Sequence, residues 1–577
     1  MKFLIALLVL LAIALIAFVC WFINYRRNGK CPVCALEKMA MPAKVTIDVD
    51  RERDYDNGAA VTPPMGWSSW NTFRNNISEE LILSTAAAMK LSGLQEAGYK
   101  YINLDDCWQS SLRDENGRLQ GDFNRFPSGI ANLISKINFM GLKAGLYSSN
   151  GTLTCEDLPA SLGNELRDAR TIASWGCEYF KYDFCHFKRI SGDAPVIEAI
   201  EISKPGKAAE LTLRPKDATF SGKARAVKIN KLPSKQGIGL LNHGAGTATF
   251  NAEVDLSGDY VITLVFYKSM NLLHEQYLQV IVNGELHEVF FPKTKGFTPT
   301  GRAQIVVNLR TGNNTIELKN PIRTLADSSY IQYSRMGNAL KKAAKEAAVE
   351  NGKAEKPIVF SICEWGTSLP WHWGGKAGNL WRTTHDILPF WESIYFIYRR
   401  NIGLYKYARP GAWNDPDMLE VGNGKLTAEE NKAHFSLWCM MASPLILGND
   451  IRKFVSDDAK PIADDPVLKI VTNRDLIAID QDILGKPAKR IKRVNGIDVL
   501  ARPLSNGDVA LCLFNTGARP KGISFDISDL GNDSYLNFNG NQAHFNVHEL
   551  WSNESYSANI ISASIEKHGV KVYRISK

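Results

Sequence analysis

Short apolar segments that end in acidic or aromatic residues recur along this chain, and helix-like stretches separate them. Four lie at 64–70, 98–104, 142–147 and 178–185, and four more at 357–363, 380–386, 413–418 and 444–450. Strands that alternate with helices predict a parallel sheet. Eight such strands predict a (β/α)8 TIM barrel, which carries its active site at the carboxyl ends of the strands. The expected fold class is therefore α/β, with a polar cup at one end of a barrel.

The barrel pattern stops near residue 190 and resumes near residue 326. The chain of 577 residues has 13 Trp and 10 Cys, and none of them lies within 191–325. Apolar and polar residues alternate there at 247–254, 260–266, 278–282, 303–309 and 314–318. This alternation predicts an inserted all-β sandwich over 191–325. Because the insertion follows the fourth strand, we expect it at the rim of the catalytic end.

The rest of the chain divides around this insertion. Residues 61–190 are expected to form the first half of the barrel, and residues 326–482 the second half. Short alternating segments at 498–502, 508–514 and 570–575 predict a C-terminal antiparallel β-sandwich over 483–577. The net charge is +8, but no Lys/Arg run has interleaved aromatic residues, so we expect no nucleic-acid partner.

The N-terminus is strongly apolar. Residues 3–23 carry no charge and are long enough to span a bilayer, and no small-x-small cleavage site follows them. We expect a signal anchor, a transmembrane helix over 1–24, with a cleaved signal as the alternative. The catalytic body would then be periplasmic or extracellular, and it would be secreted if the signal were cleaved. Basic residues at 26, 27 and 30 favour the opposite orientation, although long domains translocate largely regardless of charge.

Residues 25–60 are expected to form a solvated linker, because the run at 48–58 is charged and has no apolar period. Cys31 and Cys34 lie in this linker. With no second cysteine pair nearby, they favour a structural juxtamembrane role over a zinc or redox site.

The ends of the predicted strands contribute acidic, basic and aromatic side chains to one cup. The cup residues are Trp70, Asp105, Asp106, Tyr147, Lys181, Asp183, Glu364, Arg382, Asp386, Asp417 and Met418. Carboxylates accept hydrogen bonds from hydroxyls, and aromatic faces stack on the C–H groups of a sugar. A lone Asp at a strand end is more often a helix cap or turn former. The recurrence of such residues favours a glycosidase over other barrel enzymes. No Ser-His-Asp order, P-loop or metal-type His cluster is present, so we expect neither cofactor nor metal, with a cation bound by the Asp-rich cup as the alternative.

Six motifs in this set are distinctive together. They are Met-Gly-Trp-Ser-Ser-Trp-Asn at 65–71, Asn-Leu-Asp-Asp-Cys-Trp at 103–108, Lys-Tyr-Asp at 181–183, Cys-Glu-Trp-Gly at 363–366, Trp-Arg-Thr-Thr-His-Asp at 381–386 and Trp-Asn-Asp-Pro-Asp-Met at 413–418. In this order they resemble glycoside hydrolase family 27, the α-galactosidases. The resemblance covers the chain outside the insertion and its N-terminus. It implies a retaining enzyme made of a barrel and a C-terminal antiparallel β domain, with an α-galactoside as substrate.

The resemblance also implies roles for the cup residues. Asp183 would be the nucleophile and Asp386 the acid/base. The substrate-binding residues would be Asp105 and Asp106 at the 4- and 6-hydroxyls, Lys181 at a ring hydroxyl, Glu364, Arg382 and Asp417 near the 2-hydroxyl, and Trp70, Tyr147 and Met418 along the pocket.

Two electrostatic expectations follow from these roles. Lys181 lies on the same strand face as Asp183, so it should lower the pKa of this nucleophile. Asp386 must donate a proton, so its pKa should be raised in the substrate-loaded site. A retaining mechanism also predicts that the two carboxyl groups lie ~5–5.5 Å apart.

Alternatives share the same scaffold. The full side chain of Glu364 favours a free 2-hydroxyl, and Asp105 and Asp106 favour a sugar with a 6-hydroxyl. Both features favour galactose, so an α-N-acetylgalactosaminidase or a β-L-arabinopyranosidase is only the second hypothesis. An inactive, membrane-tethered galactoside-binding protein is the third, and the intact Asp183 and Asp386 argue against it.

The resemblance has consequences for the cysteines and the insertion. It implies a disulfide between Cys155 and Cys185, and hence an oxidising compartment, whereas Cys107 would be a free thiol. The insertion resembles carbohydrate-binding modules of the family 6 and 35 type, but its calcium-site start at 210–213 is degenerate. A purely structural insertion is the alternative.

Overall fold

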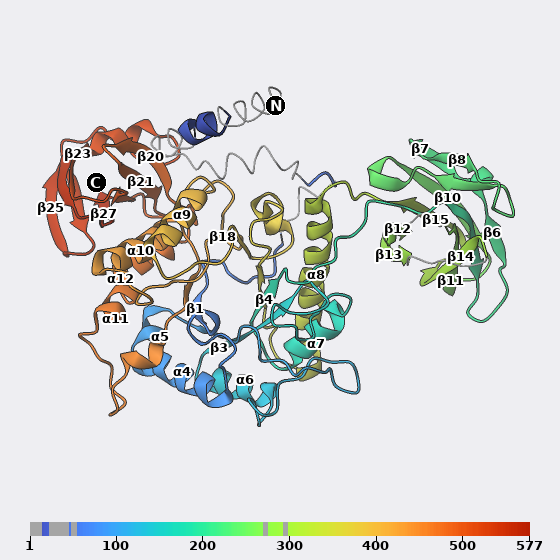
Figure 1. Ribbon diagram of the computed structural model, residues 1–577, viewed down its shortest axis with the longest axis horizontal. Coiled ribbons are helices and arrows are strands. Elements are labelled where there is room, and N and C mark those ends of the chain that lie inside the picture. Colours follow the sequence, from blue (N-terminus) through green and yellow to red (C-terminus); the bar gives the residue numbers. More distant parts are fainter. Residues whose placement is uncertain (1–13, 22–44, 48–54, 269–274, 292–297) are drawn as a thin grey trace, which may run out of the picture. The chain divides into compact units, whose positions relative to one another are not determined.

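The computed structural model describes residues 14–21, 45–47, 55–268, 275–291 and 298–577. It contains two compact units, drawn in Figure 1. The barrel unit comprises Met1–Pro42, Glu52–Phe187 and Gln332–Lys577, and the inserted unit comprises Ala43–Arg51 and Lys188–Ile331.

Eight parallel strands form the centre of the barrel unit. They are β1 (Met65–Ser68), β2 (Tyr101–Asn103), β3 (Lys143–Ser149), β4 (Tyr179–Asp183), β16 (Val359–Ile362), β17 (Leu380–Arg382), β18 (Trp413–Asp415) and β19 (Leu445–Leu447). Neighbours in the sheet follow the order of the chain, and β4 pairs directly with β16 across the insertion. The prediction of four strands on each side of an insertion is confirmed.

The barrel closes between β18 and β19. An isolated parallel bridge joins Leu419, just after β18, to Leu447 in β19. Leu419 N donates to Ile446 O at 2.8 Å, and Gly448 N donates to Leu419 O at 2.9 Å. This short seam completes the ring of strands.

Helices cover the outside of the strands. They are α3 (Trp70–Phe73), α4 (Glu79–Leu91), α5 (Leu94–Ala97), α6 (Ile130–Phe139), α7 (Glu165–Ser174), α8 (Leu325–Asn351), α9 (Trp391–Asn401), α10 (Ala428–Met440), α11 (Pro466–Val471) and α12 (Arg474–Asp480). Ser78 Oγ caps α4 by accepting from Leu81 N at 3.2 Å. Thr427 and Glu430 form a capping box at the start of α10. These caps satisfy backbone donors that a helix start leaves without partners.

The barrel interior is layered because side chains alternate along each strand. Its apolar layer consists of Tyr179, Val359, Leu380, Trp413 and Ala442. Two residues further along β4, β16, β17 and β18 come Lys181, Ser361, Arg382 and Asp415. A packed apolar floor therefore lies beneath a polar layer.

The C-terminal part of the barrel unit is an antiparallel β-sandwich, as predicted. One sheet contains, in spatial order, β20 (Lys489–Val494), β21 (Ile497–Pro503), β22 (Val509–Asn515), β27 (Val570–Ser576), β24 (Phe545–Glu549) and β25 (Glu554–Ala558). The other contains β23 (Lys521–Asp526) and β26 (Ile560–Ile565). Leu511, Phe525, Val547 and Ile561 are among the buried side chains of its core.

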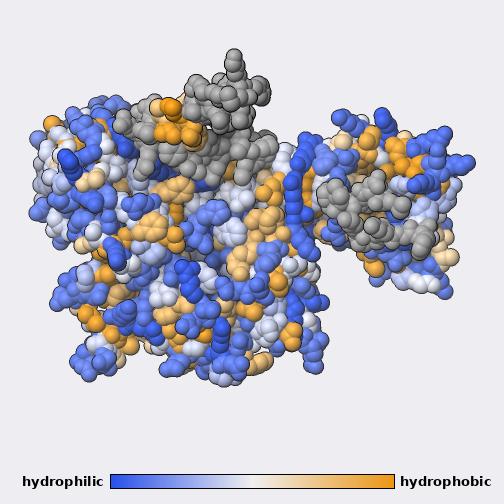
Figure 2. Space-filling view, viewed as in Figure 1, coloured by the Kyte–Doolittle hydropathy of each residue, from blue (hydrophilic) through white to orange (hydrophobic). Residues whose placement is uncertain are grey.

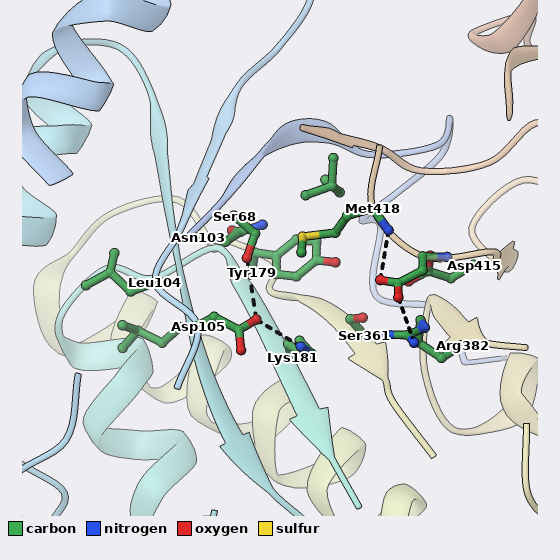
Figure 3. A pocket seen from close by; sticks show the side chains of 13 residues that line it. Ser68, Asn103, Leu104, Asp105, Tyr179, Lys181, Ser361, Arg382, Asp415 and Met418 are labelled. Carbon is green, nitrogen blue, oxygen red and sulfur yellow. Dashed lines mark hydrogen bonds and ion pairs between the residues drawn. The ribbon is translucent and has the colours of Figure 1, made fainter. Parts of the chain in front are cut away.

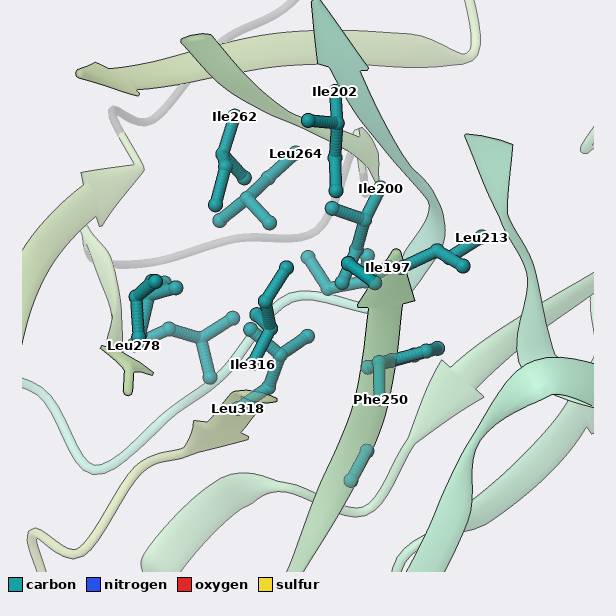
Figure 4. Packing of buried hydrophobic residues seen from close by; sticks show 14 of the residues in the cluster. Ile197, Ile200, Ile202, Leu213, Phe250, Ile262, Leu264, Leu278, Ile316 and Leu318 are labelled. Atoms are coloured by element: carbon teal, nitrogen blue, oxygen red, sulfur yellow. The ribbon is translucent and has the colours of Figure 1, made fainter. Parts of the chain in front are cut away.

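The inserted unit is also a β-sandwich. One sheet runs β13 (Glu285–Phe291), β12 (Gln276–Val282), β15 (Gly312–Lys319), β10 (Gly246–Val254), β7 (Thr219–Gly222). The other runs β14 (Thr300–Leu309), β11 (Gly258–Tyr267), β5 (Ile197–Ser203), β9 (Gln236–Gly239), β8 (Arg225–Lys228), with β6 (Leu211–Leu213) on β5. Figure 4 shows Ile200, Ile262 and Leu264 of one sheet near Leu278 and Ile316 of the other. This core belongs to the inserted unit alone.

A carboxylate at the start of α8 ties residues 45–47 to the inserted unit. Asp327 accepts from Thr46 N at 2.6 Å, Thr46 Oγ1 at 2.9 Å and Ile47 N at 3.2 Å. It also accepts from Arg323 N at 2.9 Å and Thr324 N at 2.8 Å. Burial alone would raise the pKa of Asp327, but these hydrogen bonds outweigh burial and lower it.

The prediction of a solvated linker over 25–60 is wrong where the structure describes it. Besides the bonds of Thr46, Tyr55 is 6% exposed and donates its hydroxyl to Gly337 O at 3.1 Å. Asn57 Nδ2 donates to Ile358 O at 2.8 Å. The Tyr55 ring also packs against Phe360, which favours an ordered backbone at residues 55–57. Residues 22–44, with Cys31 and Cys34, lie outside the described residues.

The predicted transmembrane segment is described only over residues 14–21, which are helical. No helix within the described ranges has the length and apolar character needed to cross a membrane. Residues 1–13 and 22–24 lie outside the description. On the face drawn in Figure 2, hydrophilic residues predominate and apolar residues form patches between them.

Candidate active site

The carboxyl ends of the barrel strands surround a small cavity (Figure 3). It is lined by Ser68, Asn103, Leu104, Asp105, Leu146, Tyr179, Lys181, Ser361, Arg382, Asp415, Asp417, Met418 and Ile446. Five of the residues predicted for the cup are among them: Asp105, Lys181, Arg382, Asp417 and Met418. The cavity therefore lies directly above the apolar floor of the barrel.

Lys181 joins two carboxylates on one side of the cavity. Its Nζ lies 2.9 Å from Asp105 Oδ2 and 3.8 Å from Asp183 Oδ2. The same Nζ lies 5.2 Å from the ring centroid of Tyr147, because Tyr147 and Lys181 are register partners in β3 and β4. A cation between two carboxylates reduces their mutual repulsion. Lys181 thus permits Asp105 and Asp183 to occupy one buried site.

Arg382 joins two further carboxylates on the other side. Its Nη2 lies 2.9 Å from Asp386 Oδ1 and 2.8 Å from Asp417 Oδ2. The side chain of Asp386 is 62% exposed, whereas that of Asp417 is 7% exposed. Arg382 therefore links a carboxylate inside the cavity to one at the surface. In Figure 3, the ion pair between Lys181 and Asp105 lies on the left and the ion pair of Arg382 on the right, with Ser361 between them.

Asp183 and Asp386 are shifted in opposite directions in this substrate-free site. Burial raises the pKa of Asp183, and Lys181 lowers it without cancelling the rise. Burial would also raise the pKa of Asp386, but Arg382 and Lys181 outweigh it and hold the pKa below its ordinary value. Lys181 lowers the pKa of Asp183, as expected, but desolvation of this nearly buried carboxylate is larger and the net shift is upward. The raised pKa expected for Asp386 concerns the loaded site and stays a prediction, as does the spacing of the two carboxyl groups.

Asp106 lies beside the cavity and not in its lining. It is 1% exposed, and its carboxylate accepts from Cys107 N at 2.7 Å and Glu156 N at 3.0 Å. Burial raises the pKa of Asp106 to about 6. Both carboxylate oxygens are therefore engaged by the backbone, one of them by the loop that follows β3.

A disulfide between Cys155 and Cys185 joins that loop to the one after β4, with a Cα–Cα distance of 5.1 Å. The two sulfurs and a carboxylate oxygen of Asp183 all lie within 4.8 Å of one another. The Tyr147 hydroxyl donates to Cys155 Sγ at 3.3 Å. The bridge agrees with the resemblance, and Cys107 is a buried free thiol. The disulfide therefore braces the loops beside Asp183.

The side chain of Glu364 is buried and forms hydrogen bonds within the turn that follows it, at Ser368. It is 0% exposed, and its Oε2 accepts from Ser368 N and from Ser368 Oγ, both at 2.7 Å. Oε1 has no hydrogen-bond partner among the described residues. Burial raises the pKa of Glu364 to about 8. The side chain does not line the cavity, so its predicted contact with a 2-hydroxyl stays a prediction.

Trp70 lies at the start of α3, just after β1. Its ring is half-buried, and the Arg74 guanidinium lies 5.2 Å from the ring centroid. The predicted residues outside the cavity lining are therefore Trp70, Asp106, Tyr147, Asp183, Glu364 and Asp386.

Asp415 is a cavity residue that the sequence analysis missed. It is 9% exposed, and its Oδ1 accepts from Asp417 N at 2.8 Å. Asp417 has a φ of +83°, a left-handed conformation that is uncommon outside glycine, so this bond fixes an unfavourable backbone. Burial raises the pKa of Asp415 to about 6, and Arg382 lowers it in part. The two-residue period along β18 could have revealed it, because Asp415 follows the buried Trp413 on the same face.

Metal-ligating side chains gather at one place among the described residues. The group consists of Cys155, Asp183 and Cys185, and its two cysteines form the disulfide. Disulfide sulfurs cannot act as thiolate ligands.

The chain matches known families over most of its length. The family described as "Alpha galactosidase A" matches residues 62–200 and 327–482, and the "Alpha galactosidase C-terminal beta sandwich domain" matches residues 494–575. The first match skips 201–326, which lies within the inserted unit.

Individual relatives agree. Alpha-galactosidase 2 of Arabidopsis thaliana is 31% identical over 90% of this chain and 91% of its own length. Alpha-galactosidase A of Cellvibrio japonicus is 31% identical over 93% of this chain and 98% of its own. The crystal structure of alpha-galactosidase I from Mortierella vinacea is 26% identical, covers 90% of this chain and 98% of its own, and has a TM-score of 0.61. With its barrel, its paired carboxylates and these matches, the chain belongs to the alpha-galactosidase family of glycoside hydrolases.

Proposed function

We propose that this chain is a retaining, exo-acting α-galactosidase that removes terminal α-D-galactosyl residues by double displacement. The observation that carries the proposal is the difference in solvent exposure between two carboxylates. The Asp183 side chain is 7% exposed beside Lys181, and that of Asp386 is 62% exposed beside Arg382. A nucleophile needs a dry site, and an acid/base must reach a leaving group and then water.

In the first step, Asp183 attacks the anomeric carbon while Asp386 donates a proton to the glycosidic oxygen. The bond from the anomeric carbon to that oxygen breaks, and an ester bond to Asp183 forms. For this step Asp183 must be ionised and Asp386 protonated. A sugar hydroxyl that binds Arg382 weakens its ion pair with Asp386, and the pKa of Asp386 then rises towards the value that an acid needs.

In the second step, Asp386 is the base. It takes a proton from a water molecule, which attacks the anomeric carbon and releases Asp183 as a carboxylate. Lys181 stabilises that leaving carboxylate by its charge. Two inversions at one carbon retain the α configuration, and the spacing expected for this outcome is ~5–5.5 Å between the carboxyl groups.

The remaining polar groups suit galactose. Asp105 and Asp106 would accept from the 4- and 6-hydroxyls, beside the Lys181 ammonium. Arg382 and Asp417 would bind near the 2-hydroxyl, and the unpaired Oε1 of Glu364 supports a further hydrogen-bond partner for that hydroxyl. Trp70, Tyr147 and Met418 would form apolar walls that stack on C–H groups. The full side chain of Glu364 favours a free 2-hydroxyl over a 2-acetamido group.

The test is a panel of p-nitrophenyl glycosides: the α-galactoside, the α-N-acetylgalactosaminide and the β-L-arabinopyranoside. We expect turnover of the α-galactoside above both others, and release of α-galactose as the first product in NMR spectra. Asp183→Ala should lose at least about 1000-fold in kcat. Asp464→Ala, at a side chain that is 98% exposed, is the matched control. Preference for another glycoside would replace the substrate assignment, and turnover of none would favour a binding protein.

We also propose that residues 3–23 attach the protein to a membrane as a signal anchor, with an extracytoplasmic catalytic body. The uncharged length of this segment supports the proposal. Full-length protein should stay with membranes after an alkaline wash, and a variant that begins at residue 25 should not. Release of the full-length protein in cleaved form would favour a secreted enzyme.

A further inference from the structure

Aromatic rings follow one another around the ends of β4, β16 and β17. Phe187 stacks on Phe184 with ring centroids 4.0 Å apart and planes 13° apart. Phe184 meets Trp365 edge-on at 6.0 Å, and Trp365 lies 5.8 Å from His385. We call Phe184, Phe187, Trp365 and His385 the aromatic rim. All four residues belong to the barrel unit.

The aromatic rim connects the two proposed catalytic carboxylates. Phe184 directly follows Asp183 in the chain, and His385 directly precedes Asp386. The base of the rim is fixed, because Phe184 is 2% exposed and packs on Tyr333, whose hydroxyl donates to Asp183 O at 3.0 Å. The rim therefore extends from the neighbourhood of the nucleophile to that of the acid/base.

The outer members of the rim are open to solvent. Phe187 is 38% exposed, His385 is exposed and Trp365 is half-buried. An exposed ring stacked on a buried one presents its other side outward, which is the surface that sugar C–H groups favour.

Two backbone positions that present these rings are strained. Trp365 has a φ of +57° and His186, just before Phe187, has a φ of +51°. Bulky residues rarely adopt this left-handed conformation, and such strain gathers at ligand sites. His186 Nε2 lies 2.9 Å from Asp157 Oδ1, so the loop carrying Phe187 is tied to the loop that the disulfide also holds.

We propose that the aromatic rim is the leaving-group subsite, where the sugar ring attached through the scissile oxygen stacks. This inference rests on the proposed function. Asp386 must touch that oxygen, so the leaving group lies on the solvent side of Asp386. The rim is the aromatic surface there that begins at the residue next to Asp386. It explains why apolar rings stand beside an otherwise acidic site.

The test compares two substrates of the full-length protein. One is α-galactosyl-(1→6)-glucose, whose leaving group is a sugar ring; the other is α-galactosyl fluoride, whose leaving group has no ring. The ratio of kcat/KM for the disaccharide to that for the fluoride should fall on the order of 5- to 10-fold in Phe187→Ala, as expected for one lost aromatic contact. Phe187→Tyr should keep the ratio, and Phe187→Leu should fall between them. Phe139→Ala is the matched control, because Phe139 is 94% exposed at the end of α6, before β3 begins.

An unchanged ratio in Phe187→Ala would overturn the inference, and so would an equal loss with both substrates, which indicates a structural effect. A fall for p-nitrophenyl α-galactoside without one for the disaccharide would assign the rim to aromatic leaving groups and overturn the sugar occupant. If the wild-type protein hydrolyses neither substrate, the proposed function itself fails. Wild-type turnover with an unchanged ratio contradicts the rim alone.

Discussion

Lys181 and Arg382 each hold two carboxylates, and together they make an acidic cup possible. Without them, the buried carboxylates of Asp105, Asp183 and Asp417 and the exposed one of Asp386 would repel one another around the cavity. The arrangement also sets unequal proton affinities. Lys181 does not offset the burial of Asp183, whereas Arg382 and Lys181 more than offset that of Asp386.

Lys181→Met should move the acid limb of activity to higher pH. Lys181 lowers the pKa of Asp183, so its removal raises that pKa further, and a nucleophile is active only above its pKa. The pH profile of kcat/KM for α-galactosyl fluoride measures this limb without the need for a proton from Asp386. Lys143→Met, which breaks an ion pair with Glu178 where β3 begins, is the control. A limb that stays in place, or moves to lower pH, would contradict the assignment of Asp183.

Glu364→Gln should change how stability depends on pH. The folded protein keeps Glu364 protonated up to a pKa of about 8, whereas an unfolded chain ionises it near its ordinary value. The free energy of unfolding should therefore fall by up to about 1.4 kcal/mol per pH unit between about pH 5 and pH 8. Glutamine cannot ionise, so this slope should disappear. Urea unfolding across that range measures the slope, with Glu350→Gln, at an exposed position near the end of α8, as the control. A slope kept in Glu364→Gln would mean that the Glu364 carboxyl is not its source.

The positions of the site residues were more predictable from the sequence than the pKa values of their side chains. The motifs gave Asp105, Lys181 and Arg382, which line the cavity. Residue type alone could not give the burial of Glu364 or the net pKa shifts, because both depend on every side chain packed around the group. The residue type of Asp415 does not reveal its role, which is to accept a hydrogen bond from Asp417 N, whereas its two-residue spacing from the buried Trp413 does place it at the cavity.

At the level of elements, the loops after β3 and β4 carry much of the site. The disulfide joins them, the Glu156 N–H holds Asp106, and the His186 contact with Asp157 adds a second tie. Loops are usually the mobile part of a barrel, and here they are cross-linked where they must position side chains.

Replacing both Cys155 and Cys185 by Ser should weaken folding and substrate binding. The bridge closes a loop of 30 residues, which corresponds to about 3–4 kcal/mol in the free energy of unfolding. KM for galactosides should rise, because Asp106 loses its fixed partner on the loop. Denaturant unfolding and steady-state kinetics measure the two effects. Cys177→Ala, at a buried free thiol, is the control. An unchanged KM would mean that the disulfide only stabilises the fold.

The eight strands were predictable because each is a buried apolar run with a polar end, and this pattern depends on nearby residues only. The anchoring of residues 45–47 and 55–57 was not predictable. It depends on Asp327 and Gly337, which lie about 280 residues away in the chain. Charged composition favours a linker, and tertiary hydrogen bonds override it.

At the scale of the whole molecule, the chain contains separate cores. The inserted sandwich buries Phe250, Ile262 and Leu278 within its own two sheets. The barrel strands on either side of the insertion pair with each other directly, as β4 does with β16. Each unit therefore holds its own stabilising contacts. The expected position of the inserted unit at the rim of the catalytic end stays a prediction.

Asp327→Ala should destabilise the inserted unit selectively. Five donors lose a buried acceptor, and we expect the unfolding transition of this unit to lose on the order of 3 kcal/mol while the barrel transition stays in place. The wild-type contribution is present above the unfolded pKa and is lost as pH falls through the lowered folded pKa. The variant should therefore lose less stability on acidification. Calorimetry at pH 7 and at about pH 3, below the unfolded pKa, measures both effects. The exposed Asp255→Ala is the control, and a shift of both transitions together would contradict independent units.

The seam that closes the barrel has a consequence for motion. It rests on a single bridge at Leu419, two residues beyond Asp417, whereas most neighbouring strand pairs share a longer ladder. A ring of strands opens first where it has the fewest bonds, and local opening exposes backbone amides to exchange. Local opening of this seam would move Asp417 away from Arg382, and it would disturb the cavity before the rest of the barrel unfolds. A bound sugar that contacts both the β18 and the β19 side of the seam would hold the seam closed. The backbone amide of Leu419 should therefore exchange its hydrogen more slowly when the sugar is bound.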